Sequence, residues 1–183
     1  MNWLGPILLF LCAFVAVFVE ASFDTFRNLT GTQFDLLPPL MVYAALTHGM
    51  PVLTALAVLS GLWFDSLSAN PPGVTILPLF LVGLTIHQNR DFLLRENSFA
   101  QWVLGAGASA FVPALSVVIL LNTGTHPLVG WASLWPWLIV TVTGAAATPV
   151  LFVFFDRVNR ALTYQRAAES SFRPDREIKR GRS

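Results

Sequence analysis

Four ionisable side chains adjoin long apolar stretches and are the candidates for chemistry: Glu20, His48, Asp65 and His87. A charge at the centre of a bilayer costs about 3 kcal/mol on insertion scales, so an acid or base kept near lipid needs a reason. All four lie at the ends of apolar stretches. The spacings typical of zinc proteases, serine hydrolases, phosphate-binding loops and Cys/His metal sites do not occur in the sequence. We therefore predict a protein that is not an enzyme and has no catalytic residue, metal or cofactor.

The two histidines are interpreted as interfacial residues that bond to water or backbone, in preference to ligands or proton carriers. Glu20, with Asp24, is interpreted as a solvated boundary of the first apolar stretch. Asp65 leaves two interpretations open. It caps a helix end or bonds the amides of the loop Ser66–Pro72, or it makes a contact that fixes the helix arrangement or receives a partner. In the same loop, Asn70 is predicted to cap the next helix and Pro71 to take its first position.

Composition sets the environment in which these residues must be held. Of 183 residues, 55% are hydrophobic and 11% charged, whereas about a quarter of the residues of a soluble domain are charged. The sequence therefore predicts an all-α, polytopic membrane bundle of about six transmembrane helices. The predicted segments are Trp3–Val19, Phe34–Leu46, Met50–Phe64, Pro72–Ile86, Phe99–Leu121 and Leu134–Phe155.

The segments differ in length. The last two are long enough to cross a hydrocarbon layer of about 30 Å, and the second and third are predicted to be too short. Whether the second and third both cross, or form a broken hairpin shielded by neighbours, stays open. The first segment is expected to be retained, because no positively charged leader precedes it. Cys12 lies within it and is interpreted as a packing residue.

Lys and Arg predict the orientation, because cytoplasmic loops are enriched in them. If both termini are cytoplasmic, ten of the eleven basic residues lie inside and Arg27 lies outside. The tail from Asp156 onward is basic, and we predict that the last helix continues along the membrane surface, where it would attract anionic lipid. Residues 1–160 are predicted to form the transmembrane domain and residues 161–183 a basic cytoplasmic tail. The mixed charge of the tail argues against nucleic acid as a partner.

Two stretches of small residues predict close helix contacts in the fifth and sixth segments. Gly105 and Ser109 are four apart, as are Gly144 and Thr148, and this spacing lets helix backbones approach closely. Contact between the two segments of one chain is favoured over contact with another subunit.

Three parts of the sequence resemble the MreD family of bacterial rod shape-determining membrane proteins. They are the run Phe34–Tyr43, the run Gly61–Ser68 with Gly73 after it, and Trp135-Pro136-Trp137 followed by Phe155–Val158. The resemblance covers Phe34 to about Leu162, and its motif is Gly-x-x-x-Asp-x-x-Ser. It singles out Gly61, Asp65, Ser68 and Gly73 as a partner-binding or structural motif. The Pro71-Pro72 turn and the long basic tail depart from the family pattern.

The resemblance implies a non-enzymatic scaffold of the cell-elongation machinery in the bacterial inner membrane. Its partners would be MreC and, through MreC, the MreB filament, RodA and the penicillin-binding transpeptidase of RodA, in support of peptidoglycan synthesis and cell shape. In helix arrangement the family also resembles the substrate-binding subunits of energy-coupling-factor transporters. A membrane subunit that binds a vitamin or other small solute is therefore the alternative function.

Overall fold

The structure is a computed structural model that describes residues 4–22, 35–68, 70–90, 98–123 and 130–171. Within these ranges the chain is entirely helical, with six α-helices, one 3₁₀ turn and no strand. The helices are α1 (Leu4–Ser22), α3 (Leu37–Thr47), α4 (Met50–Leu67), α5 (Ile76–Gln88), α6 (Ser98–Asn122) and α7 (Leu134–Ser171), with the 3₁₀ turn at Trp131–Ser133. Each of the six predicted segments therefore contains a helix, and the all-α prediction is confirmed.

Three helices are long and apolar enough to cross a membrane: α4, α6 and the part of α7 from Leu134 to Ala161. The prediction that the third segment is too short is wrong, because α4 has 18 residues and continues beyond Phe64 to Leu67. At 1.5 Å per residue α4 is about 27 Å long, and α6, with 25 residues, about 37 Å. The chain thus has the helices of a membrane protein.

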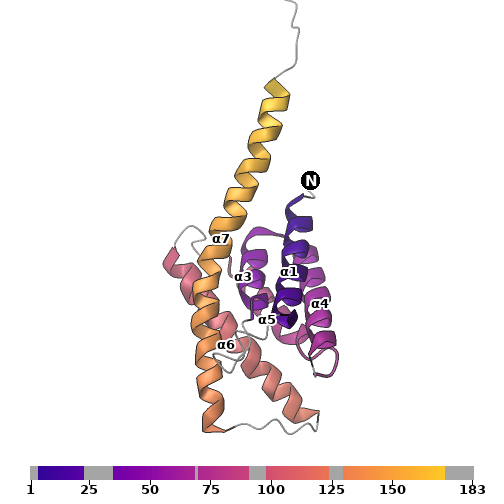
Figure 1. Cartoon of the computed structure of the whole chain (residues 1–183), viewed down its shortest axis with the longest axis vertical. Helices are drawn as coiled ribbons and strands as arrows, with labels where there is room; N and C mark the ends of the chain where they lie inside the picture. The colour runs from indigo at the N-terminus through magenta and orange to yellow at the C-terminus, as the bar shows by residue number, and fades with distance from the viewer. Residues whose placement is uncertain (1–3, 23–34, 69, 91–97, 124–129, 172–183) are drawn as a thin grey trace, which may run out of the picture. The chain divides into compact units, whose positions relative to one another are not determined.

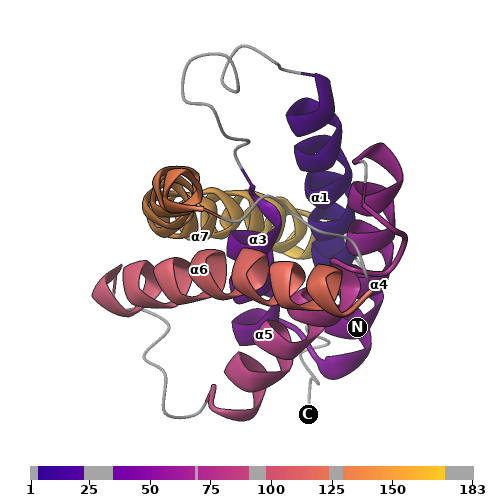
Figure 2. The same cartoon turned by 90° about the horizontal axis from the view of Figure 1, so that it is seen from below.

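Helix α3 lies at the centre of the first five helices. Its residues from Leu37 to Ala45 are all buried, and it contacts α1, α4, α5 and α6. Figure 2 shows these four helices around it. A helix that is apolar on every side is stable when other apolar groups cover it on every side, and neighbouring helices cover α3 in this way. Its 11 residues reach only about 17 Å.

Helices α4 and α5 follow one another in the chain and pack together, and α1 packs on α4. Figure 1 shows α1, α3, α4 and α5 side by side. The edge of the Trp63 ring on α4 meets the Phe14 ring on α1 at a centroid distance of 5.1 Å. On α1, the buried residues Leu9, Ala13, Ala16 and Val17 form one face, and large apolar side chains cover the opposite, exposed face.

The chain divides into two compact units, residues 1–152 and residues 153–183. The first unit holds α1 to α6 and the start of α7, and the second holds the rest of α7, which remains helical to Ser171. The predicted domain boundary after residue 160 therefore falls within α7. The tail beyond Ser171 lies outside the described residues, as do Asp24 and Arg27.

Candidate functional site

Asp65 on α4 holds the turn that leads into α5. Its side chain is buried, with 2% of its surface exposed. Oδ2 accepts hydrogen bonds from the backbone N–H groups of Gly73, at 2.7 Å, and Thr75, at 3.2 Å. Oδ1 accepts a bond from the Thr75 hydroxyl at 2.5 Å. Both carboxylate oxygens are thus satisfied by the segment immediately before α5.

This arrangement replaces the helix cap predicted from the sequence. Helix α5 begins at Ile76, so Asn70 and Pro71 lie before it and neither caps it nor starts it. The residue at the N-cap, Thr75, makes no side-chain cap bond of its own. Because Asp65 already binds the amides of Gly73 and Thr75 from the neighbouring helix, α5 begins five residues after Pro71, its predicted first residue.

The other three residues of the motif lie around the same turn. A Cβ on Gly61 would come within 2.9 to 3.0 Å of the backbone and side chain of Ile76, so only glycine allows α4 and α5 to meet there. Gly73 has φ +99°, which favours glycine. The Ser68 hydroxyl bonds the Asp65 carbonyl and accepts from the Asn70 amide, at 3.3 and 3.4 Å. We call Gly61, Asp65, Ser68, Gly73 and Thr75 the α4–α5 corner.

Helices α6 and α7 meet through the four small residues that the spacing singled out. A Cβ on Gly105 would clash with the Thr148 side chain, and a Cβ on Gly144 would clash with the Ser109 side chain. Each helix thus offers one glycine and one hydroxyl residue to the other. Thr148 bonds its own helix at the Gly144 carbonyl, at 2.9 Å, and the Trp137 indole N–H donates to Ala110 O at 3.0 Å. The fully buried Ser109 hydroxyl has no hydrogen-bond partner within the described part of the chain.

The two histidines lie at the C-terminal end of α3. His87, in the last turn of α5, has Nδ1 at 2.9 Å from the Ala45 carbonyl. A carbonyl oxygen can only accept, so Nδ1 carries the hydrogen. His48 Nδ1 lies 2.6 Å from the Thr47 hydroxyl, which itself donates to Tyr43 O. The His87 bond serves the Ala45 carbonyl, one of the last four in α3, which the end of a helix leaves without an intrahelical partner.

Glu20 differs from its predicted role as a solvated boundary. Both of its carboxylate oxygens are buried and have no hydrogen-bond partner among the residues that the structure describes. Glu20 lies four residues after Ala16 and seven after Ala13, and so on the same face of α1 as these two buried residues. The Asp35 carboxyl group is close enough to interact with it, and Asp35 Oδ1 itself accepts the Leu37 amide at 2.9 Å. Glu20 is buried because it lies on the inward-facing side of α1. The amino-acid type alone does not reveal that placement.

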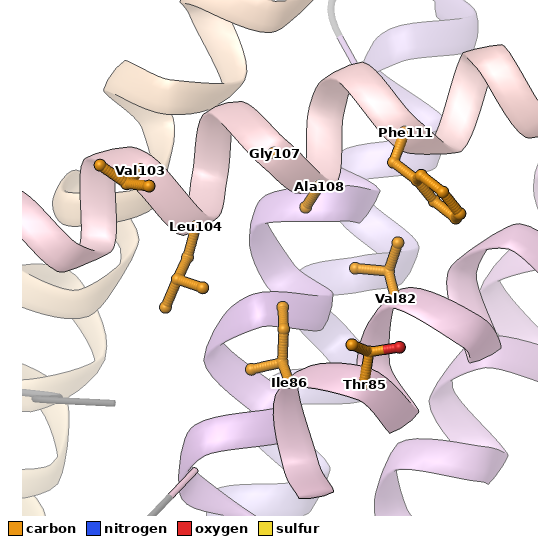
Figure 3. A pocket seen from close by; sticks show the side chains of 8 residues that line it. All are labelled: Val82, Thr85, Ile86, Val103, Leu104, Gly107, Ala108 and Phe111. Atoms are coloured by element: carbon orange, nitrogen blue, oxygen red, sulfur yellow. The ribbon is translucent and has the colours of Figure 1, made fainter. Parts of the chain in front are cut away.

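An open groove of about 260 Å³ lies between α5 and α6. Figure 3 shows side chains from both helices directed into it. The lining residues are Val82, Thr85, Ile86, Val103, Leu104, Gly107, Ala108 and Phe111. Thr85 is the polar one, and its hydroxyl donates to Leu81 O of its own helix at 2.8 Å. The groove therefore presents hydrocarbon and no unused hydrogen-bonding side chain among these eight.

The described residues contain no group of three or more His, Cys, Asp or Glu side chains that could hold a metal ion. Of the predicted site residues, the structure brings Gly61, Asp65, Ser68 and Gly73 together at one corner, and Gly105, Ser109, Gly144 and Thr148 together at one crossing. The sequence reasoning missed Thr75. The feature of the sequence that could have indicated it is a hydroxyl residue ten positions after Asp65.

The fold defines a class, the all-helical membrane proteins, through three helices of spanning length and composition. Comparison with protein-family models, with curated proteins and with solved structures found no match for this chain.

Proposed function

We propose that this protein is a non-enzymatic membrane scaffold of the MreD type, which binds MreC in the bacterial inner membrane. Through MreC it would associate with the MreB filament, RodA and the penicillin-binding transpeptidase, and so support cell shape. The observation that carries the proposal is the convergence of Gly61, Asp65, Ser68 and Gly73 at the α4–α5 corner. These are the residues that the resemblance to MreD singles out, and here each has a physical role in one rigid turn.

In this proposal all six helices belong to the transmembrane bundle, with both termini in the cytoplasm. The short helices α3 and α5 need an explanation, because about 17 and 20 Å do not cover a hydrocarbon layer of about 30 Å. Irregular backbone at membrane depth is tolerated where protein shields it. The burial of α3 from Leu37 to Ala45 supports that arrangement, since neighbouring helices cover these residues.

The surfaces support a partner that is itself a membrane helix. Helix α1 exposes Leu4, Ile7, Leu11, Phe14 and Phe18, each between 44 and 60% exposed, along one face. Their spacing of three and four residues is the spacing that lets one helix pack against another. A solute-binding subunit, in contrast, needs several polar groups that converge on the ligand. The groove between α5 and α6 offers one hydroxyl, and that hydroxyl is already bonded.

Co-purification tests the proposal. The full-length tagged chain is co-expressed with MreC and purified in mild detergent, and MreC is compared with an unrelated single-pass membrane protein. We expect MreC to be strongly enriched over that protein. We also expect the variant Ile7→Ala/Leu11→Ala to reduce the enrichment more than the matched variant Leu134→Ala/Leu138→Ala, which removes the same number of atoms from exposed apolar residues of α7. Equal recovery of MreC and the unrelated protein would reject the scaffold, and a thermal shift with a vitamin would favour the transporter subunit.

A further inference from the structure

We propose that the groove between α5 and α6 is a binding site for one anionic phospholipid, which inserts an acyl chain between the helices and places its head group beside Arg90. This inference rests on the membrane orientation given in the proposed function, which puts the α5–α6 loop on the cytoplasmic side. The site is separate from the face of α1 that is proposed to bind MreC.

The lining of the groove selects an apolar occupant. Seven of the eight lining residues present only carbon, and Thr85 keeps its hydroxyl on Leu81 O. A volume of about 260 Å³ holds roughly nine groups of water or methylene size, at about 30 Å³ each. That corresponds to the inner part of one acyl chain. A whole helix, about 10 Å wide with its side chains, could insert only single side chains there.

Gly107 keeps the groove open. A Cβ built on Gly107 would have no atom within 4 Å, whereas a Cβ on Gly105, two residues earlier on α6, would clash with Thr148. The space beside Gly107 is therefore unfilled by the protein itself. Ala108, the next residue, also contributes a small side chain to the groove wall, as Figure 3 shows.

Along α5, apolar residues are followed by a basic residue, which matches the acyl chain and the anionic head group of a phospholipid. Val82 and Ile86 line the groove one turn apart, and α5 ends at Gln88. Asn89 and Arg90, both exposed, follow one turn beyond Ile86. Hydrocarbon thus lies next to a cationic side chain at the level where the apolar helix ends. Anionic lipids face the cytoplasmic side, where each basic residue near the surface attracts them, so charge and depth both match an anionic phospholipid.

Lipid titration followed by native mass spectrometry of the full-length chain tests the site. The probes are phosphatidylglycerol and phosphatidylethanolamine with the same acyl chains, added to protein in mild detergent without MreC. We expect one phosphatidylglycerol to bind in preference to phosphatidylethanolamine. Gly107→Leu and Thr85→Leu, which fill the groove from opposite walls, should each weaken binding about fivefold or more. Arg90→Gln should reduce the preference for phosphatidylglycerol while acyl-chain binding persists.

Ser116→Leu is the control, because it places the same leucine side chain on α6 half a turn around the helix from Gly107, and it should bind lipid as the wild type does. If both groove-filling variants bind lipid as tightly as Ser116→Leu does, the site is overturned. It is also overturned if those variants lose a co-purifying protein while lipid affinity stays unchanged, since the groove then holds a helix. If MreC fails to co-purify with the full-length chain while the lipid still binds, the scaffold function is rejected and the lipid site is retained.

Discussion

Asp65 shows why an acid can be kept beside lipid. Three donors converge on its carboxylate, two from backbone amides and one from the Thr75 hydroxyl. A carboxylate is a pure acceptor with about four lone-pair positions, so it accepts all three without offering a hydrogen that must itself be satisfied. An asparagine amide could accept only on its oxygen, so its N–H group would face one of these donors, or the Thr75 hydroxyl would have to turn and accept. The residue type therefore follows from the turn that it holds.

Replacement of Asp65 should destabilise the fold. We expect Asp65→Ala to lower the free energy of unfolding by about 2 kcal/mol or more, because the Gly73 and Thr75 amides lose a charged acceptor in a buried place. For a chain of this size that corresponds to a fall of about 4 to 8 °C in the thermal midpoint.

Ser66→Ala is the control for thermal unfolding in detergent. Ser66 is exposed and its hydroxyl bonds only the Leu62 carbonyl of its own helix, at 2.7 Å. Its replacement should change stability by less than about 0.5 kcal/mol. Equal midpoints for Asp65→Ala and Ser66→Ala would contradict the structural role assigned to Asp65.

The residue types next to apolar stretches predict which side chains have a structural role. They predict less well what that role is. The position of Asp65 at the end of an apolar stretch predicts that it has a bonding partner, but the partners lie eight and ten residues later and follow from how α4 and α5 meet. Glu20 also ends an apolar run, and that position alone predicts a solvated side chain. Which face of α1 turns inward depends on the other helices, and this dependence is why the sequence could not place Glu20.

At the scale of the elements, the crossing of α6 and α7 depends on glycine at two places. The Ser109 side chain packs against Gly144 and the Thr148 side chain against Gly105. Small residues let membrane helices approach closely enough for van der Waals contact to hold them. The Ser109 hydroxyl, which has no conventional partner, lies against the Gly144 backbone, where weak Cα–H···O contacts are common between helices.

A side-chain swap tests this crossing. Gly144→Ala should destabilise the protein by about 1 to 3 kcal/mol, because its Cβ overlaps the Ser109 side chain. Adding Ser109→Gly removes the overlapping atoms, so the double variant should be more stable than the sum of the single changes implies.

Thermal unfolding of the two single variants and the double variant gives the coupling free energy. The control cycle combines Gly144→Ala with Ser116→Gly, since Ser116 bonds Val112 O of its own helix, and it should be additive. Additivity within about 0.5 kcal/mol in the Ser109 cycle would mean that the two residues do not interact.

Apolar runs predicted where helices occur because a backbone in lipid must satisfy its hydrogen bonds within a helix. The agreement is closest for α6, predicted at Phe99–Leu121 and observed at Ser98–Asn122. It is poorer at the start of α5, where the apolar run begins at Pro72 but the Asp65 bonds hold residues 73–75 in a turn. Helix ends thus depend on contacts between elements, and these contacts are absent from any local pattern.

At the scale of the whole molecule, the proposed function requires that the chain crosses the bilayer and that each loop faces a particular side. Helix α6 is the clearest crossing, with 25 residues, a mean hydropathy of 2.2 in its candidate span and a length of about 37 Å. Asn89 lies just before the loop that leads into α6, and Asn122 ends α6. The two residues should therefore lie on opposite sides of the membrane, and we predict from the distribution of Lys and Arg that Asn89 lies inside.

Labelling of single cysteines at Asn89 and Asn122 is the most direct test. The two positions are matched, because both are exposed and each side-chain amide donates to the carbonyl four residues earlier, at 2.8 Å. With Cys12→Ala as background, a membrane-impermeant maleimide should label Asn122→Cys in intact spheroplasts and Asn89→Cys only after lysis. Labelling of both cysteines in intact spheroplasts, or of Asn89→Cys alone, would contradict the account.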